Sequence, residues 1–284
     1  MKDRDWRLYP RMNFDQQLAS VINTGKSSRK RANEIMGQKV PILDFDTFNL
    51  RYRQGFQWAY EFFSDSISKN VIATIAAMHL GLAPPPENHE GEGTKYFLRG
   101  MSSPAEDEIF VDGGFFIGDT AHAFLKLTGN RFVHYYGFDP SQVNLGQSFG
   151  HLHNDDRISI INKALWSCET WLPFDENGTG GSRIEKGGAQ LAEAVSLDWF
   201  FKGFPFDELP TFIKLDVEKA EKHAIMGAKK IILDRSPRLV VCLYHRIEDI
   251  YELPRLIHEI NPCYEMRIRH HDDTGFLDTV LYCF

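Results

Sequence analysis

From residue 108 onward, short apolar runs alternate with stretches whose apolar positions follow helical spacing. The runs predict strands at 109–111, 132–138, 158–161, 211–215, 239–244, 264–269 and 278–284. Helices are predicted between them at 119–128, near Leu197, at 218–233 and up to about residue 260. Strands that alternate with helices favour parallel pairing, with helices on both faces of the sheet. The pattern therefore predicts an α/β fold for this part of the chain.

The first 93 residues show a different pattern and predict a mainly helical N-terminal region. One helix is expected at 45–63, a stretch rich in Phe, Tyr and Trp. A second helix is expected after "SDSISK", capped by Ser64, Asp65 or Ser66. The apolar run 71–83 is shorter than the ~20 residues of a membrane span. It contains Thr74 and His79, and we interpret it as a buried helix without a membrane span.

A linker follows at 83–93, "APPPENHEGEG", which combines prolines, glycines and acids. We therefore expect a helical region with its linker at 1–93 and a second domain at 94–284. Within the second domain, the segment 168–194 contains "NGTGG" and is interpreted as a mobile insertion that could border a ligand pocket. The stretch "RHHDD" at 269–273 is interpreted as a solvated loop, or as substrate contacts, after a strand rather than as a metal site.

The composition excludes some classes of protein and favours others. With 43% hydrophobic residues, 22 of them Phe, the 284-residue chain can bury a sizeable core. A formal net charge of −7 argues against a general nucleic-acid binder. Four cysteines without a CxxC pair indicate reduced thiols, and "MKDRDWRLYP" lacks the apolar stretch of a secretory signal. A cytoplasmic protein is expected, and its oligomeric state stays open.

Polar residues stand at the ends of four predicted strands, namely Asp112, Asp139, Asp216 and His245. In parallel sheets, ligands bind at the carboxyl ends of the strands, near the point where the strand order reverses. These four residues therefore mark the expected site.

The turn after the first of these strands is rich in glycine. Asp112, Gly114 and Gly118 form a DxGxxxG pattern, whereas a dinucleotide fingerprint needs GxGxxG. Gly113 stands at the first variable position and is also a candidate cofactor-binding residue. Asp112 is expected to meet a ligand ammonium, directly or through water. Gly114 is expected to let a ligand approach the backbone, and Gly118 to let the helix start close to the strand. The alternative is a plain glycine-rich turn.

Asp139 ends the next strand, where a carboxylate can accept hydrogen bonds from both hydroxyls of a ribose. An ammonium site followed by a ribose site fits S-adenosylmethionine (SAM), which has an amino-acid end, a ribose and an adenine. The sequence therefore predicts SAM as cofactor.

At this point the chain resembles the FkbM family of SAM-dependent methyltransferases. The matching stretches, in the family's order, are "EIFVDGGFFIGDT", "YYGFDPSQVN", "PTFIKLDVEKAEKHAIMGAKKII", "PRLVVCLYHRIEDIYELP" and "DTVLYCF". "SDSISK" and "KYFLRG" are similar to upstream segments of long-chain members.

The resemblance implies a Rossmann-like, seven-stranded class I methyltransferase sheet whose last strand is antiparallel. It also implies O-methyl transfer, often to a sugar hydroxyl in polysaccharide biosynthesis or on a glycosylated natural product, with a small molecule or a glycan as acceptor. Asp112, Gly114, Gly118 and Asp139 fall on the family's cofactor positions. Two departures are Lys219, where the family has glycine, and Leu243, where many members have an acid.

An alcohol acceptor needs a group that takes its proton. Asp216 and His245 are the candidates, and Lys214 could pair with Asp216. Alternatively, Asp216 caps a helix that starts at Glu218, and His245 is a core histidine. An Asp/His set could also hold a divalent metal, which the small number of ligands does not favour.

Two other functions remain open at this stage. A nicotinamide-dependent oxidoreductase is weakened by the missing GxGxxG pattern. A non-catalytic SAM-binding module is kept open by Lys219 and Leu243.

Overall fold

A computed structural model describes residues 12–25, 42–83, 85–86, 95–176, 181–272 and 278–284. The chain divides into two compact units. One comprises Met1–Asn88 with Asp272–Leu277, and the other His89–His271 with Asp278–Phe284. Most of the linker predicted at 83–93, and the boundary expected at its end, lies outside the described residues.

The described part of the N-terminal unit is helical, as the sequence predicted. Its helices are α1 (Phe14–Gly25), α3 (Phe45–Arg51), α4 (Arg53–Phe62) and α5 (Ser66–His79). The single helix expected at 45–63 is two helices that meet at Tyr52. Asp65 caps α5, because its carboxylate accepts the backbone N–H of Ser68 at 3.0 Å. Most of α5 is buried, Thr74 and His79 included, which confirms the buried helix.

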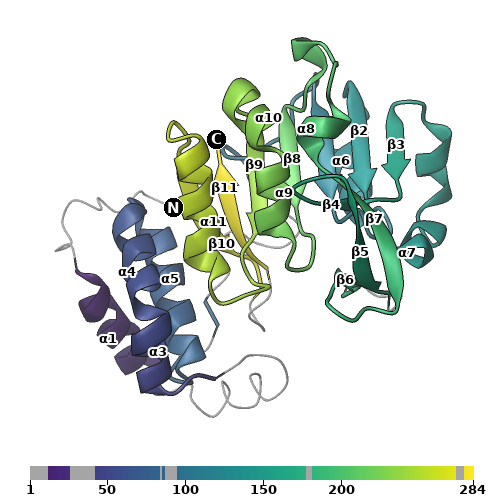
Figure 1. Cartoon of the computed structure of the whole chain (residues 1–284). Helices are drawn as coiled ribbons and strands as arrows, with labels where there is room; N and C mark the ends of the chain where they lie inside the picture. The colour runs from purple at the N-terminus through teal and green to yellow at the C-terminus, as the bar shows by residue number, and fades with distance from the viewer. Residues whose placement is uncertain (1–11, 26–41, 84, 87–94, 177–180, 273–277) are drawn as a thin grey trace. The chain divides into compact units, whose positions relative to one another are not determined.

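The second unit is built on a seven-stranded sheet of order β10-β11-β9-β8-β1-β2-β3 (Figure 1). Its strands are β1 (Ile109–Gly113), β2 (His134–Phe138), β3 (Ile158–Ile161), β8 (Phe212–Leu215), β9 (Arg238–Cys242), β10 (Met266–His270) and β11 (Thr279–Cys283). Strands β1, β2, β3, β8 and β9 pair in parallel, and β11 is antiparallel to β9 and β10. The predicted Rossmann-like, seven-stranded sheet with an antiparallel last strand is confirmed.

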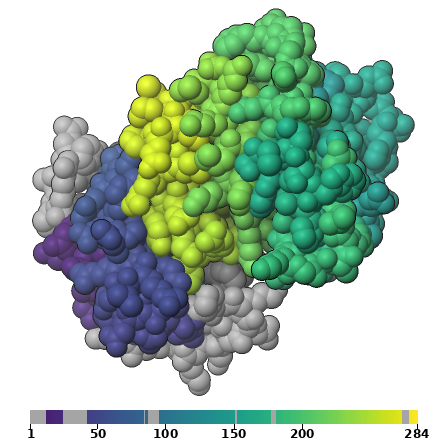
Figure 2. All heavy atoms as spheres, in the orientation of Figure 1, coloured from purple at the N-terminus to yellow at the C-terminus, as the bar shows by residue number. Residues whose placement is uncertain are grey.

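Helices cover both faces of this sheet. They are α6 (Asp119–Thr128), α7 (Gln142–Gly146), α8 (Leu197–Phe200), α9 (Glu221–Gly227), α10 (Lys229–Arg235) and α11 (Asp249–Ile260), with 3₁₀ turns η3 (Gly150–Asn154) and η4 (Phe206–Glu208). Tyr135 and Tyr136 are adjacent in β2, so they point to opposite faces. Tyr135 contacts Phe124 of α6, and Tyr136 contacts Phe201 beside α8. Figure 2 shows that side chains fill the spaces left between the ribbons of this unit in Figure 1.

The prediction of one helix at 218–233 is wrong about where the helix begins and about its continuity. The segment contains α9 and α10, and the first of these begins at Glu221. Glu218 and Lys219 have φ of 49° and 78°, in the left-handed region, so they cannot belong to a right-handed helix. They form a turn between β8 and α9 instead.

The segment predicted as an insertion at 168–194 contributes to a second sheet, of order β4-β7-β5-β6. Its strands are β4 (Ala164–Leu165), β5 (Thr170–Asp175), β6 (Arg183–Ile184) and β7 (Gln190–Val195), and most of "NGTGG" lies outside the described residues. The loop predicted at 269–273 is wrong at its start, because Arg269 and His270 are buried in β10. Asp273 lies outside the described residues.

Candidate functional site

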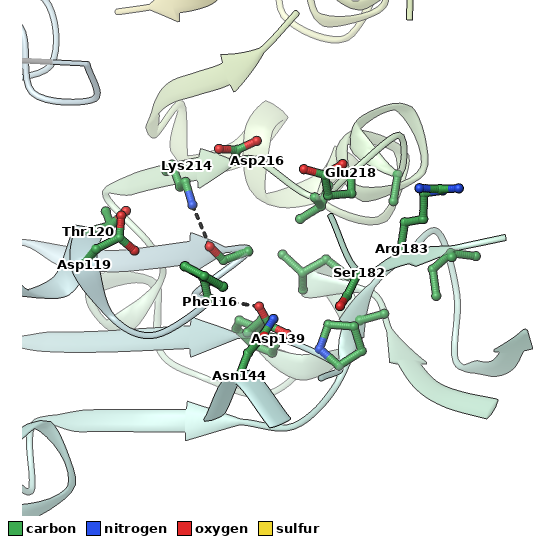
Figure 3. Close-up of a pocket in the computed structure, with 18 of the residues that line it drawn as sticks. Phe116, Asp119, Thr120, Asp139, Asn144, Ser182, Arg183, Lys214, Asp216 and Glu218 are labelled. Carbon is green, nitrogen blue, oxygen red and sulfur yellow. Dashed lines mark hydrogen bonds between the residues drawn. The ribbon is translucent and has the colours of Figure 1, made fainter. Parts of the chain in front are cut away.

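A cavity opens at the carboxyl ends of β1, β2 and β8 (Figure 3). One side presents Asp139 and Asn144, and the opposite side presents Asp216 and Glu218. Apolar side chains of both sheets also line it, namely Phe138, Leu165, Phe174 and Ile184. The location agrees with the strand-end site expected from the sequence.

Asp112 lies beneath the cavity and does not line it. Its side chain is fully buried in β1, where it accepts the hydroxyl of Tyr135 and pairs with Lys214 Nζ at 2.8 Å. Burial raises the pKa of Asp112, and the positive charge of Lys214 opposes that shift. Lys214 also donates to the carbonyl of Gly114 at 2.8 Å (Figure 3). Lys214 therefore pairs with Asp112 rather than with Asp216.

The protein's own backbone requires glycine at two positions of the turn. Gly114 has φ of 81°, and a Cβ there would lie 1.9 Å from the carbonyl oxygen of Asp216. Gly118 has φ of 86° at the start of α6, where a Cβ would lie 2.5 Å from the side chain of Leu152. Gly113 lies inside β1, packed against Leu215. Of these glycines, Gly114 lines the cavity.

Asp139 faces the cavity from the end of β2. Its Oδ2 accepts the backbone N–H of Phe116 and its Oδ1 that of Ser141, each at 2.8 Å. Burial raises the pKa of Asp139 to about 6, although these two N–H groups lower it. A carboxylate has about four acceptor sites, so both oxygens can still accept a ligand hydroxyl.

Asn144 adds an unused acceptor beside Asp139. Its side-chain oxygen is buried, with no hydrogen-bond partner among the described residues, and the residue lines the cavity. Buried polar groups are rarely left unpaired, so an unpaired one at a cavity indicates a ligand donor. Acceptors on one side and apolar side chains around them suit a ribose joined to an adenine.

Asp216 is held by a set of donors on the other side of the cavity. Tyr96 donates to Oδ2 at 2.6 Å, Tyr244 donates to Oδ1 at 2.9 Å, and Lys95 Nζ lies 3.6 Å from Oδ2. Burial would raise the pKa of Asp216, but Lys95, Lys214 and His245 hold it well below its usual range. The carboxylate is therefore ionised and only weakly basic. It does not cap a helix, because α9 begins at Glu221 and its N-cap is Ala220.

His245 is surrounded by three carboxylates. Its Nδ1 lies 2.8 Å from Glu221 Oε1, and its Nε2 lies 3.3 Å from Glu218 Oε1 and 3.4 Å from Asp216 Oδ1. Burial would lower the pKa of His245, but the negative charges raise it well above its ordinary value. The raised pKa favours the protonated ring, and the role of His245 as the base that takes the acceptor's proton stays a prediction.

Sequence reasoning missed several residues of this site. Asp216, Glu218 and His245 bring ligand atoms within 4.8 Å of one another, a set that could hold a metal ion. The sequence had suggested only Asp216 and His245 as ligands. Lys95 and Tyr96 also escaped notice, although "KYFLRG" was among the stretches that resemble the family.

The two departures from the family pattern have distinct structural settings. Lys219 has φ of 78°, a conformation in which glycine is unstrained, and this explains why glycine suits that position. Leu243 is buried and follows β9 directly.

Among the described residues, no helix is both long and apolar enough to cross a membrane.

Comparisons with known proteins agree with this architecture. The family model described as "Methyltransferase FkbM domain" matches residues 108–263. The crystal structure of methyltransferase FkbM from Methylobacillus flagellatus KT is similar, with a TM-score of 0.71 and 25% identity. That match covers 87% of this chain and 62% of the other, so this chain spans less than two thirds of that protein's length.

Aeropyrum pernix fibrillarin, solved with natively bound S-adenosyl-L-methionine, has a TM-score of 0.45 and 11% identity over 67% of this chain and 73% of its own. That likeness is too weak to support an argument. The curated proteins contain no match to the chain.

Proposed function

The chain belongs to the FkbM methyltransferase family, and we propose that it is a SAM-dependent O-methyltransferase that acts on a hydroxyl of a sugar or glycan. The observation on which the cofactor proposal rests is the cavity side formed by Asp139 and Asn144. Its acceptors match the donors of an adenosine. Nothing in the described site favours a nicotinamide cofactor.

The expected cofactor residues divide into two groups. Asp139 would accept the ribose hydroxyls directly, and Gly114 would let the cofactor lie against the backbone of the turn. Asp112 would act indirectly, because it holds Lys214 and, through it, the carbonyl of Gly114. Gly113 and Gly118 would shape the turn.

Bound SAM supplies a methyl group that its sulfonium already makes electrophilic. The protein's main task is then to hold an acceptor oxygen in line with that methyl, and positioning of this kind is worth effective molarities of about 10⁵ M or more. Tyr96, Tyr244, Lys95 and Glu218 line the cavity around Asp216. This combination of hydroxyls, charges and aromatic rings suits the polar edges and apolar faces of a sugar.

The acceptor class can be tested by transfer of labelled methyl from SAM to fractionated cellular glycans and nucleotide sugars. We expect label in a carbohydrate fraction, recovered after acid hydrolysis as an O-methyl sugar. Asp139→Ala, which removes the proposed ribose acceptor, should abolish most of the transfer at low SAM concentration. Label found only in protein or nucleic acid would contradict the proposed acceptor.

A further inference from the structure

Asp216, Glu218 and His245 form a cluster in which the distances from the imidazole to the two carboxylates are long for hydrogen bonds. The Nε2 atom of His245 has no hydrogen bond among the described residues, and its side chain is only 5% exposed. The nearest carboxylate oxygens, from Glu218 and Asp216, are 3.3 and 3.4 Å away. Hydrogen bonds between an imidazolium and a carboxylate are about 2.7–2.9 Å long, so this buried nitrogen lies beside two anions at more than that length.

The spacing fits atoms that share a metal ion. Ligands bound at about 2.0–2.2 Å lie about 2.8–3.1 Å apart when adjacent in an octahedron and about 3.3–3.6 Å apart in a tetrahedron. The two separations from His245 Nε2, 3.3 and 3.4 Å, fall in the tetrahedral range, and all three ligand atoms lie within 4.8 Å of one another.

The surrounding contacts resemble those that orient metal ligands. A metal-binding histidine usually has a carboxylate or carbonyl on its other ring nitrogen. Glu221 Oε1 lies 2.8 Å from His245 Nδ1, and Glu221 is itself fixed by the backbone N–H of Val217 at 2.9 Å. The hydroxyls of Tyr96 and Tyr244 hold the Asp216 carboxylate, with Oδ1 as the atom nearest to His245.

We propose that Asp216, Glu218 and His245 bind a first-row divalent metal ion at the edge of the cofactor cavity. One imidazole nitrogen with two carboxylate oxygens suits ions such as Mn²⁺ or Zn²⁺ better than Ca²⁺, which takes oxygen ligands. Asp216 and Glu218 line the cavity from the side opposite Asp139, so the free coordination positions are accessible from it (Figure 3).

The role of the ion rests on the proposed function. A hydroxyl bound to the ion would be more acidic, so the acceptor would lose its proton more readily. The acceptor O–H bond breaks and its proton leaves to water. The oxygen electron pair forms the new C–O bond, while the S–CH₃ bond breaks and leaves its electrons on sulfur.

Metal binding can be measured on the whole chain without SAM or acceptor. Protein stripped with chelator and exchanged into metal-free buffer is titrated with Mn²⁺, and the free ion is followed by electron paramagnetic resonance. Zn²⁺ is then added as a competitor. We expect one Mn²⁺ per chain, displaced by Zn²⁺.

Three variants locate the ion. Glu218→Gln should weaken Mn²⁺ binding at least tenfold, and Glu221→Gln, which changes only the partner of Nδ1, should weaken it about 10–100-fold. Glu252→Gln makes the same change in a surface pair with Lys222 and should leave binding unchanged. Circular dichroism checks that each variant is folded.

Wild-type protein that binds neither Mn²⁺ nor Zn²⁺ at 0.1 mM would overturn the proposal, and so would binding that Glu218→Gln leaves intact. Methyl transfer is a separate readout. A protein that binds the metal but transfers no methyl would count against the proposed function, and one that transfers methyl equally well without metal would count against the role of the ion.

Discussion

The buried ion pair between Lys214 and Asp112 supports a prediction about stability. Lys214→Met removes the positive charge and keeps much of the side-chain volume. It leaves the Asp112 carboxylate without its charged partner. The Asp112 side chain is fully buried, and the Lys214 side chain is only 3% exposed. Breaking a buried pair from one side costs about 3–5 kcal/mol, because the remaining charge has lost its partner. The Tyr135 hydroxyl alone does not compensate.

The measurement is the free energy of unfolding from urea titration, followed by circular dichroism and Trp fluorescence. The matched control is Lys222→Met, which breaks a pair with Glu252 whose side chains are 49% and 32% exposed. That change should cost less than about 1 kcal/mol. The double variant Asp112→Asn/Lys214→Met removes both charges and should recover at least half of the loss. If Lys214→Met costs no more than Lys222→Met, the pair does not have the structural role described here.

Three further changes test single features of the site. Asp139→Asn should weaken S-adenosylhomocysteine binding by about 1.5–3 kcal/mol, while Asp156→Asn, the same change at an exposed position outside the cavity, should not. Because the pKa of Asp139 is about 6 and the carboxylate is the binding form, wild-type affinity measured by calorimetry should fall as the pH drops through about 6, and this fall should be absent in Asp139→Asn. Lys219→Gly should raise the free energy of unfolding by about 1 kcal/mol, since it relieves a φ of 78°, whereas Lys230→Gly in α10 should lower it. Gly114→Ala should lower the free energy of unfolding by more than about 2 kcal/mol even without ligand. A neutral effect would contradict the close contact between Gly114 and the backbone of Asp216.

Local patterns were sufficient for much of the fold. The helix predicted at 119–128 and the strand at 158–161 match α6 and β3, because each has a clear period and, for α6, a glycine at its end. The strands of the second sheet were missed. In β5 the alternation is short and interrupted by Pro173, and the segment around it contains loop-like glycines.

The site was predictable only in part, because its contacts depend on strand order and on one unusual turn. Asp112 and Lys214 are partners in the register of neighbouring strands β1 and β8, which are separated by some hundred residues of sequence. Glu218 and Glu221 reach His245 through a turn in which Glu218 and Lys219 adopt left-handed φ. No local rule predicts that conformation for two successive residues that are not glycine.

The cofactor is the central claim, and one calorimetric comparison tests it most directly. S-adenosylhomocysteine and NAD are titrated separately into the purified whole chain at pH 7.5. The account predicts a binding isotherm for S-adenosylhomocysteine with one site per chain, and no heat of binding for NAD. Binding of NAD without binding of S-adenosylhomocysteine would contradict it.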